Sequence, residues 1–167
     1  MPLTYLVQSI IDVLRERGET LCVAESLTGG GLASSITALP GASDVFLGGV
    51  IAYNTSVKEN LLHVSVSLVE EFTVVSEEVA QAMAFGAANA TGATWAIATT
   101  GVAGPGPSEG AAAGTVWVAI VGPVHHSTLL QLQGGRDDVR NATISSAIST
   151  FSRILGIRSS ELPEAVS

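Results

Sequence analysis

The 167-residue sequence has little basic charge, a single cysteine and few aromatic residues. Seven Lys and Arg residues against fifteen Asp and Glu residues give a formal net charge of −8 at pH 7. Nucleic acids and anionic membrane surfaces are bound by clustered Lys and Arg, so the composition argues against both kinds of partner. The one cysteine, Cys22, excludes an internal disulfide framework and is typical of a reducing compartment, so we expect a cytoplasmic protein.

Signals for secretion and for membrane insertion are also lacking. The N-terminus has no basic segment followed by an apolar run and a cleavage site. Residues 79–108 carry no charge, but they are mostly Ala, Gly and Thr and end in a Gly-Pro-Gly-Pro turn. They contain no strongly apolar run of 18 residues, so we expect no membrane span. A sheet buried on both faces, with small residues where helices pack, explains this stretch better.

Hydrophobic periodicity and turn residues predict alternating helices and strands followed by a hairpin. This order indicates an α/β fold, a three-layer α/β/α sandwich with a mixed sheet of about five strands. We expect a single domain over residues 1–156 and a polar tail over 157–167. The predicted helices are 3–17, 28–39, 56–62, 66–72, 76–89 and 137–155, and the predicted strands are 20–25, 45–53, 94–100, 115–121 and 124–132.

Two local patterns sharpen this prediction. The pair Gly48-Gly49 inside the strand at 45–53 indicates a bulge or a close approach of another backbone. The segment Ser56-Val57-Lys58-Glu59 matches a capping box, with serine at the cap and glutamate three residues later.

Ser26 stands where a strand ends and a glycine-rich helix start follows, in the segment AESLTGG at 24–30. Free backbone N–H groups at such a position bind anions or stabilise an oxyanion, and a serine there can be exposed as a nucleophile must be. A capping serine before a glycine turn explains the same residues, and for this segment taken alone it is the more frequent case. The segment matches neither a P-loop nor a dinucleotide-binding GxGxxG pattern.

Lys58 is the one lysine in the sequence, and no other basic side chain lies between Arg17 and Arg136. A solvated lysine has a pKa of about 10.4 and is a poor base at neutral pH. Removed from water, its pKa can fall towards ~7–8, and the amine can then accept a proton from serine, which arginine cannot do. A surface lysine on a capped helix is the alternative, and the sequence does not choose between the two.

Three further positions are candidates at strand ends. Tyr53 could relay a proton or orient the lysine, or it could pack on the sheet as an ordinary strand aromatic. Thr100 and Gly101 end another strand, where side chains often line a site at the rim of an α/β sheet, although the glycine could simply make a turn.

Two arginines begin the last helix, and no metal site is specified. Arg136 and Arg140 could hold a phosphate as planar multi-donor cations, or they could lie on the surface beside neighbouring aspartates. His125 and His126 are adjacent in a strand, so they face opposite sides and cannot ligate one metal together. We therefore expect neither a metal nor another cofactor.

Taken together and in this order, these motifs resemble the CinA C-terminal domain family. The resemblance covers roughly residues 5–155, nearly the whole chain. The segments that carry it are AESLTGG (24–30), PGAS (40–43), GGVIAYNTSVK (48–58), VSEEVA (75–80), TGVAGPG (100–106), GTVWVAI (114–120) and RDDVR (136–140).

The resemblance implies an activity. The family includes stand-alone nicotinamide-nucleotide amidases, which convert nicotinamide mononucleotide to nicotinic acid mononucleotide and ammonia in pyridine nucleotide salvage. By similarity, Ser26 would be the nucleophile and Lys58 its general base, with Tyr53 beside them. The implied fold is a three-layer α/β/α sandwich, and the implied assembly is a homo-oligomer, a dimer or larger. The substrate-binding positions implied in this way are Thr28, Gly29, Gly30, Thr100, Gly101 and Arg140.

One loop departs from the family pattern. Members commonly carry a Gly-Gly…Lys-Pro-Val-Gly-Thr-Val segment before the strand at 115–121, whereas residues 106–114 here read GPSEGAAAG, without the lysine and its proline. A smaller difference is Gly135 before Arg136, where an aspartate is usual. If this loop contacts the substrate, affinity or substrate choice differs.

Two alternatives to an amidase remain open at this point. The first is a non-catalytic nucleotide-binding module, in which Ser26, Thr100 and Arg140 only bind. The second is an interaction domain associated with competence or DNA damage, although the acidic charge argues against direct contact with DNA.

Overall fold

The protein is described by a computed structural model that covers residues 1–158. The strands are β1 (Leu21–Glu25), β2 (Phe46–Ile51), β3 (Trp95–Gly101), β4 (Thr115–Val121) and β5 (His126–Gln131). Within the described residues they form one sheet in the order β2-β1-β3-β4-β5. The first three strands in that order are parallel, and β4 and β5 are each antiparallel to their preceding neighbour. The predicted mixed sheet is therefore confirmed.

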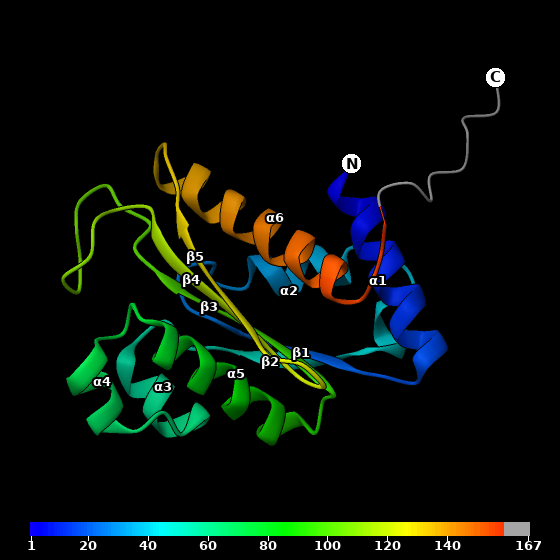
Figure 1. Ribbon diagram of the computed structural model, residues 1–167, viewed down its shortest axis with the longest axis horizontal. Helices are drawn as coiled ribbons and strands as arrows, with labels where there is room; N and C mark the ends of the chain where they lie inside the picture. The colour runs from blue at the N-terminus through cyan, green and yellow to red at the C-terminus, as the bar shows by residue number, and fades with distance from the viewer. Residues whose placement is uncertain (159–167) are drawn as a thin grey trace.

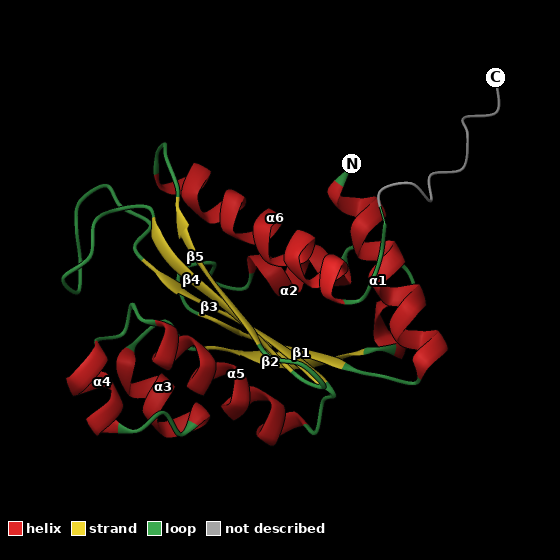
Figure 2. Cartoon of the chain, viewed as in Figure 1, coloured by secondary structure: helices red, strands yellow, loops and turns green. Residues whose placement is uncertain are grey.

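Helices cover both faces of this sheet (Figures 1 and 2). One face carries α1, α2 and α6, and the other carries α3, α4 and α5, which confirms the predicted three layers. Apart from its first two residues, the predicted tail at 157–167 lies outside the described part of the chain. The helices are α1 (Leu3–Arg17), α2 (Gly31–Thr37), α3 (Thr55–Leu62), α4 (Val66–Phe72), α5 (Glu77–Thr91) and α6 (Arg136–Ile154), with a single 3-10 turn at Ala42–Asp44.

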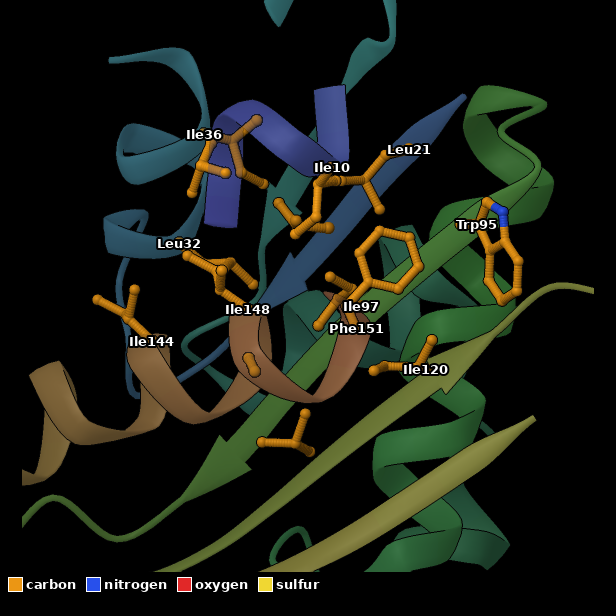
Figure 3. Packing of buried hydrophobic residues seen from close by; sticks show 14 of the residues in the cluster. Ile10, Leu21, Leu32, Ile36, Trp95, Ile97, Ile120, Ile144, Ile148 and Phe151 are labelled. Atoms are coloured by element: carbon orange, nitrogen blue, oxygen red, sulfur yellow. The ribbon is translucent and has the colours of Figure 1, made fainter. Parts of the chain in front are cut away.

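Large side chains fill the space between the sheet and α1 and α6. Ile148 and Phe151 of α6 belong to one buried cluster with Ile97 and Ile120 of the central strands (Figure 3). The Phe151 ring meets the Trp95 ring edge to face, with the ring centroids 5.3 Å apart. Burying a side chain of this size contributes about 1.5–3 kcal/mol, so this layer supplies much of the stability of the fold.

The opposite layer is built from small residues. Ala84 and Ala87 of α5 are fully buried against Ala96 and Ala98 of β3. Alanine lets helix and sheet backbones approach closely, which explains why residues 79–108 are uncharged and rich in Ala and Gly. Among residues 1–158, no helix is both long enough and apolar enough to cross a membrane.

The glycine pair in β2 serves both roles that the sequence indicated. Pairing with β1 shifts by one residue between Phe46 and Gly48, which is a bulge, and Gly48 has φ = 134°. At Gly49 a Cβ would overlap the carbonyl oxygen of Val23 in the neighbouring strand. The two glycines therefore let β2 bend and lie close to β1.

The start of α3 differs from the sequence prediction. The N-cap is Asn54, whose side chain accepts a hydrogen bond from the Ser56 amide at 2.9 Å, and the helix begins at Thr55. The predicted cap at Ser56 is therefore wrong by two residues, because an asparagine just upstream caps the helix and leaves Ser56 inside its first turn. The helix predicted to start at 76 does start there within one residue, since Ser76 is the N-cap of α5 and accepts from the Val79 amide.

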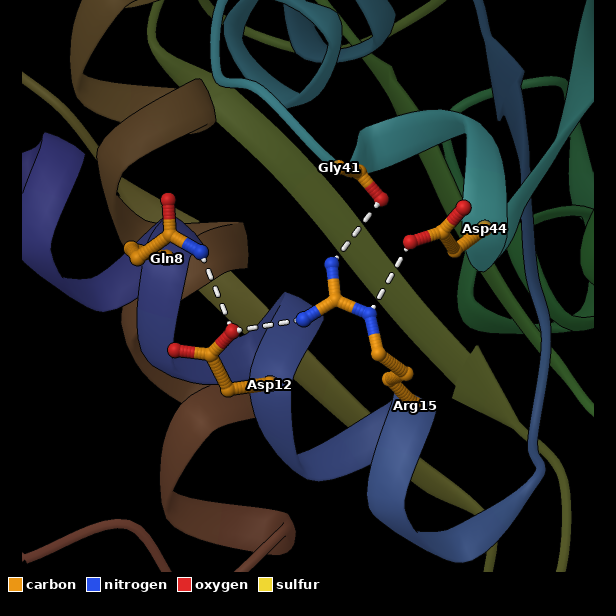
Figure 4. A network of polar contacts seen from close by, with 5 residues as sticks. All are labelled: Gln8, Asp12, Arg15, Gly41 and Asp44. Carbon is orange, nitrogen blue, oxygen red and sulfur yellow. Dashed lines mark hydrogen bonds and ion pairs between the residues drawn. The ribbon is translucent and has the colours of Figure 1, made fainter.

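A polar network ties α1 to the turn after α2 (Figure 4). Arg15 donates to the carboxylates of Asp44 and Asp12, at 3.0 Å in both cases, and to the Gly41 carbonyl at 3.5 Å. The Gln8 amide also donates to Asp12. These groups are exposed, so each ion pair contributes at most about 1 kcal/mol, and the network mainly orients the segment that leads into β2.

Gly86 sets the distance between α3 and α5. A Cβ at this position would overlap the Leu62 carbonyl at the end of α3. Gly86→Ala should lower the free energy of unfolding by about 1–3 kcal/mol in a denaturant titration, because overpacking outweighs the gain in helix propensity. Gly106→Ala is the control, since nothing lies within 4 Å of its Cβ position. Equal stability of wild type and Gly86→Ala would show that residue 86 does not limit this approach.

Candidate active site

A cavity of about 280 Å³ opens at the carboxyl ends of β1 and β3. The chain leaves β1 towards one face of the sheet and reaches β3 from the other, and ligand sites of open α/β sheets lie at such switch points. The volume is near the lower end of small-molecule sites, roughly 300–1,000 Å³. The polar side chains that line the cavity are Ser26, Tyr53, Thr55, Lys58, Thr100, Ser108, Glu109 and Arg136.

The start of α2 is occupied by a carboxylate from its own chain. Glu25 is completely buried, and its two carboxylate oxygens accept from the amides of Leu32 at 2.8 Å and Ala33 at 3.0 Å. The expectation that the N-terminus of this helix binds a substrate anion is therefore wrong, because its amides already bind Glu25. This contact holds the helix directly behind Ser26.

The turn after Ser26 is shaped by residues that do not line the cavity. Gly29 and Gly30 have φ of 59° and 100°, which delays the helix to Gly31 instead of the predicted position 28. The Thr28 hydroxyl is buried against that of Thr99 at 2.8 Å. The family resemblance implies Thr28, Gly29 and Gly30 as substrate-binding positions; in the structure they form the turn that presents Ser26, and the Thr28 hydroxyl is already engaged.

Lys58 brings its amine to Ser26 from the other side of the sheet. The residue is 2% exposed, and Nζ lies 3.1 Å from Ser26 Oγ. It also donates to the carbonyl oxygens of Ala52 at 2.7 Å and Tyr53 at 3.4 Å. Burial lowers the pKa of the Lys58 amine from 10.5 to about 8, and the negative charge of Glu109 opposes this shift.

The two carbonyls give the amine a defined orientation. A carbonyl oxygen can only accept, so a neutral amine directs its two hydrogens to Ala52 and Tyr53 and keeps its lone pair for the Ser26 hydroxyl. The protonated amine can donate its third hydrogen to the same oxygen. Proton exchange between Ser26 and Lys58 therefore needs no movement of either side chain.

Residues 3–155 match the CinA C-terminal domain family. The chain belongs to this family. A CinA-like protein of Synechococcus sp. (strain RCC307) is 46% identical over 148 residues, which are 86% of this chain and 36% of the relative. A CinA-like protein of Prochlorococcus marinus (strain MIT 9313) is 50% identical over 119 residues, which are 71% of this chain and 28% of the relative. The chain thus spans about a third of the length of the curated relatives it matches.

Solved structures of CinA proteins have the same fold along most of this chain. The competence damage-inducible protein A (ComA) of Klebsiella pneumoniae superposes with a TM-score of 0.90 at 30% identity, covering 93% of this chain and 98% of its own. A CinA superfamily protein of Escherichia coli gives a TM-score of 0.89 at 30% identity, with coverages of 92% and 90%. The two solved chains are thus covered almost completely by the present chain.

In this CinA domain, Tyr53 contacts the lysine through its backbone. The residue is 58% exposed, and its hydroxyl accepts from Arg136 at 2.8 Å. Arg136 also donates to the Gly104 carbonyl at 2.8 Å, so the guanidinium bridges the mouth of the cavity. The interpretation of Tyr53 as a side-chain proton relay therefore has no contact to support it, whereas its carbonyl does orient Lys58.

The two arginines of α6 lie in different surroundings. Arg136 lines the cavity, whereas Arg140 donates to the carbonyls of Leu27 at 3.1 Å and Thr28 at 3.3 Å, behind the Ser26 turn. Its Nη1 also lies 3.6 Å from Asp137. Of the two arginines that the sequence offers for a phosphate, Arg140 holds the turn and Arg136 lines the cavity.

The end of β3 contributes the cavity wall. The Thr100 hydroxyl is buried and donates to the Val74 carbonyl at 2.7 Å, so it braces the segment before α5. Gly101 lies against the Thr115 carbonyl, where a Cβ would clash. Both residues line the cavity as expected from the sequence, Thr100 with its hydroxyl already engaged.

Glu109 is the residue that the sequence reasoning missed. It lies in the loop between β3 and β4 and faces the cavity that holds Ser26 and Lys58. The signal was weak, because an acid before a glycine marks a turn and says nothing about where that turn folds. The sequence of this loop differs from the family pattern, but that difference alone does not place the Glu109 carboxylate at the cavity.

The lowered pKa of Lys58 makes stability depend on pH. Between about pH 8 and 10.5 the unfolded chain binds a proton that the folded chain has lost, so the free energy of unfolding rises with pH. The difference between wild type and Lys58→Met, measured by denaturant unfolding at several pH values, should rise by about 3 kcal/mol over this window. Other titrating groups are common to both proteins and cancel. A constant difference would mean that Lys58 ionises as it does in the unfolded chain.

Proposed function

We propose that this CinA domain is an amidohydrolase that deamidates nicotinamide mononucleotide through a Ser26 nucleophile and a Lys58 base. The supporting observation is the 3.1 Å contact between Ser26 Oγ and a lysine amine that is 2% exposed, at the wall of a cavity. A nucleophile within hydrogen-bond reach of a base of lowered pKa is the arrangement that acyl transfer requires. Family membership supports the choice of substrate.

The first half of the reaction forms an ester on Ser26. Neutral Lys58 takes the hydroxyl proton as Ser26 Oγ bonds to the carboxamide carbon, and the carbonyl oxygen becomes an oxyanion. When the oxyanion collapses, the carbon–nitrogen bond breaks, and Lys58 gives its proton to the departing nitrogen, which leaves as ammonia. The same side chain thus acts as base and then as acid.

Backbone amides next to Ser26 are the candidates for holding the oxyanion. Within residues 1–158, the amides of Leu27 and Thr28 donate to no protein acceptor. Because the peptide unit is planar and trans, the Thr28 N–H points away from the Leu27 carbonyl, which accepts from Arg140. The guanidinium therefore polarises this N–H and fixes its direction. Removing one oxyanion donor typically lowers the rate by about 10²–10³.

The second half of the reaction restores the enzyme. Lys58 accepts a proton from water as the water oxygen bonds to the ester carbon, and the bond to Ser26 Oγ breaks. The proton taken by Lys58 returns to Ser26, and the new carboxylic acid releases its remaining proton to solvent, so that nicotinic acid mononucleotide leaves as a carboxylate. The steps as written use Ser26, Lys58 and water, and they require no metal ion and no redox partner.

Arg136 is the group suited to the 5′-phosphate. Two of its five N–H donors are used by Tyr53 and Gly104, and three remain for a ligand. The amide of Gly135 is bound to the Asp138 carboxylate at 2.8 Å, so the helix terminus itself has an anion already. A guanidinium can outweigh the net charge of −8 locally, because exposed charges are screened beyond about 8–10 Å in physiological salt.

Ser26→Ala and Lys58→Met should both abolish ammonia release from nicotinamide mononucleotide. Loss of the base is expected to lower kcat by about 10²–10⁴-fold, and loss of the nucleophile should leave the uncatalysed rate. Lys58→Arg keeps a positive charge but cannot deprotonate at neutral pH, so it should be as inactive as Lys58→Met.

Ser34→Ala is the matched control, because Ser34 is exposed on the following helix. Wild-type rates in both Ser26→Ala and Lys58→Met would refute the mechanism. Thermal stabilisation of the wild-type protein by the nucleotide, without release of ammonia, would instead identify a nucleotide-binding module.

Replacing Arg136 and replacing Arg140 should change different kinetic constants. Arg136→Gln is expected to raise KM for nicotinamide mononucleotide about tenfold with little effect on the phosphate-free riboside, because a charge-assisted contact is lost. Arg140→Gln should lower kcat about tenfold for both compounds, since it loosens the turn and not the phosphate site.

Arg153→Gln, at the far end of the same helix, controls for the change in net charge. The assignment is wrong if Arg140→Gln raises KM for the phosphorylated compound alone.

A further inference from the structure

We propose that the Glu109 carboxylate recognises the positive charge of the substrate's pyridinium ring, so that the site prefers the oxidised nucleotide over its neutral dihydropyridine form. The proposal rests on the amidase function above and adds a determinant of specificity to it. It is carried by the backbone of the loop between β3 and β4 and by the charges around the cavity.

The loop presents Glu109 at the tip of a two-residue turn. Ser108 and Ala111 exchange two backbone hydrogen bonds, at 3.0 and 2.9 Å, and the residues between them are Glu109 with φ = 51° and Gly110 with φ = 75°. Two positive φ angles are typical of a type I′ turn, which favours Asn, Asp or Gly at both positions. Glutamate is disfavoured in left-handed backbone, so the turn itself does not explain its presence at position 109. A role of its side chain does explain it.

Glu109 supplies the negative charge of the cavity. The other titratable side chains that line it are Lys58, Arg136 and Tyr53. Arg136 and Tyr53 bond to each other, and Lys58 bonds to Ser26 and two carbonyls. Within residues 1–158, the Glu109 carboxylate takes part in no hydrogen bond or short ion pair, and it acts on Lys58 only through space. It is therefore free to face a cation in the cavity.

The chemistry of the substrate places a cation there. The carboxamide of nicotinamide mononucleotide is carried by a pyridinium ring with a fixed positive charge. When its carbonyl carbon lies at Ser26 Oγ and its phosphate lies at Arg136, the ring occupies the space between them, where the cavity wall includes Glu109. The dihydropyridine form has the same carboxamide, ribose and phosphate but a neutral ring, so it isolates this one interaction.

The arrangement also explains why an acid is tolerated beside the base. Glu109 favours protonated Lys58 in the empty site. A bound pyridinium neutralises the carboxylate and repels a protonated amine, so substrate binding shifts Lys58 towards the neutral form that acts as a base. The negative charge of Glu109, which attracts the substrate, is thus neutralised by the bound pyridinium ring before Lys58 acts as a base.

Binding in a Ser26→Ala background tests the proposal without turnover. Dissociation constants for the oxidised and the dihydropyridine mononucleotides are measured by calorimetry at pH 8, with and without Glu109→Gln. The preference for the oxidised form should fall by about fivefold, through weaker binding of that form alone, as expected for a partly exposed ion pair. Glu109→Asn removes the charge while suiting the left-handed turn, so the same result there separates charge from loop structure.

Glu71→Gln is the control, since Glu71 is an exposed acid on α4 and its loss changes the net charge equally. An unchanged preference in both Glu109 variants would overturn the proposal. If the wild-type protein still released ammonia from the oxidised nucleotide, the amidase function would stand without it. Failure of the oxidised nucleotide to bind would overturn both.

Discussion

The contact between a buried amine and the Ser26 hydroxyl is the constraint around which this domain is arranged. An amine with 2% exposure needs acceptors inside the protein, and the carbonyls of Ala52 and Tyr53 supply them where β2 passes into α3. The buried Glu25 carboxylate holds the turn that carries the hydroxyl. Glycines in β2 and α5 let these pieces come close enough, so packing distances and catalytic geometry depend on the same positions.

The charged side chains of the cavity differ in burial and in position, although the chain as a whole is acidic. The lysine is buried and easily deprotonated, Arg136 stays charged at the rim, and Glu109 faces them from the loop. Arg140 lies one helical turn beyond Arg136, yet it binds backbone carbonyls of the Ser26 turn. Net charge therefore says little about what this site binds, because neighbouring side chains dominate the field inside a cavity.

Helix and strand positions were largely predictable, and their ends were less so. The apolar stripe of α1 and the alternation of strands and helices predict the observed layers. They do so because a helix or strand with one apolar face is stabilised by burying that face. The cap of α3 was predicted at Ser56 and is Asn54, since both side chains can cap a helix and the sequence does not show at which of them the helix starts. The late start of α2 at Gly31 comes from the left-handed backbone of Gly29 and Gly30, and its first amides bind Glu25, a residue four positions before Gly29 that no cap rule would select.

The amino-acid order was enough to place a serine after a strand, to identify the one lysine as unusual and to connect both with a family of layered α/β domains. Whether that lysine was solvated or buried, which arginine faced a ligand, and where Glu109 pointed could not be read from it. The first two depend on contacts between segments 32 and 113 residues apart, and the third depends on how the loop between β3 and β4 folds over the cavity. Local patterns register propensity and periodicity, but burial, and with it the pKa of an amine, is a property of the assembled layers.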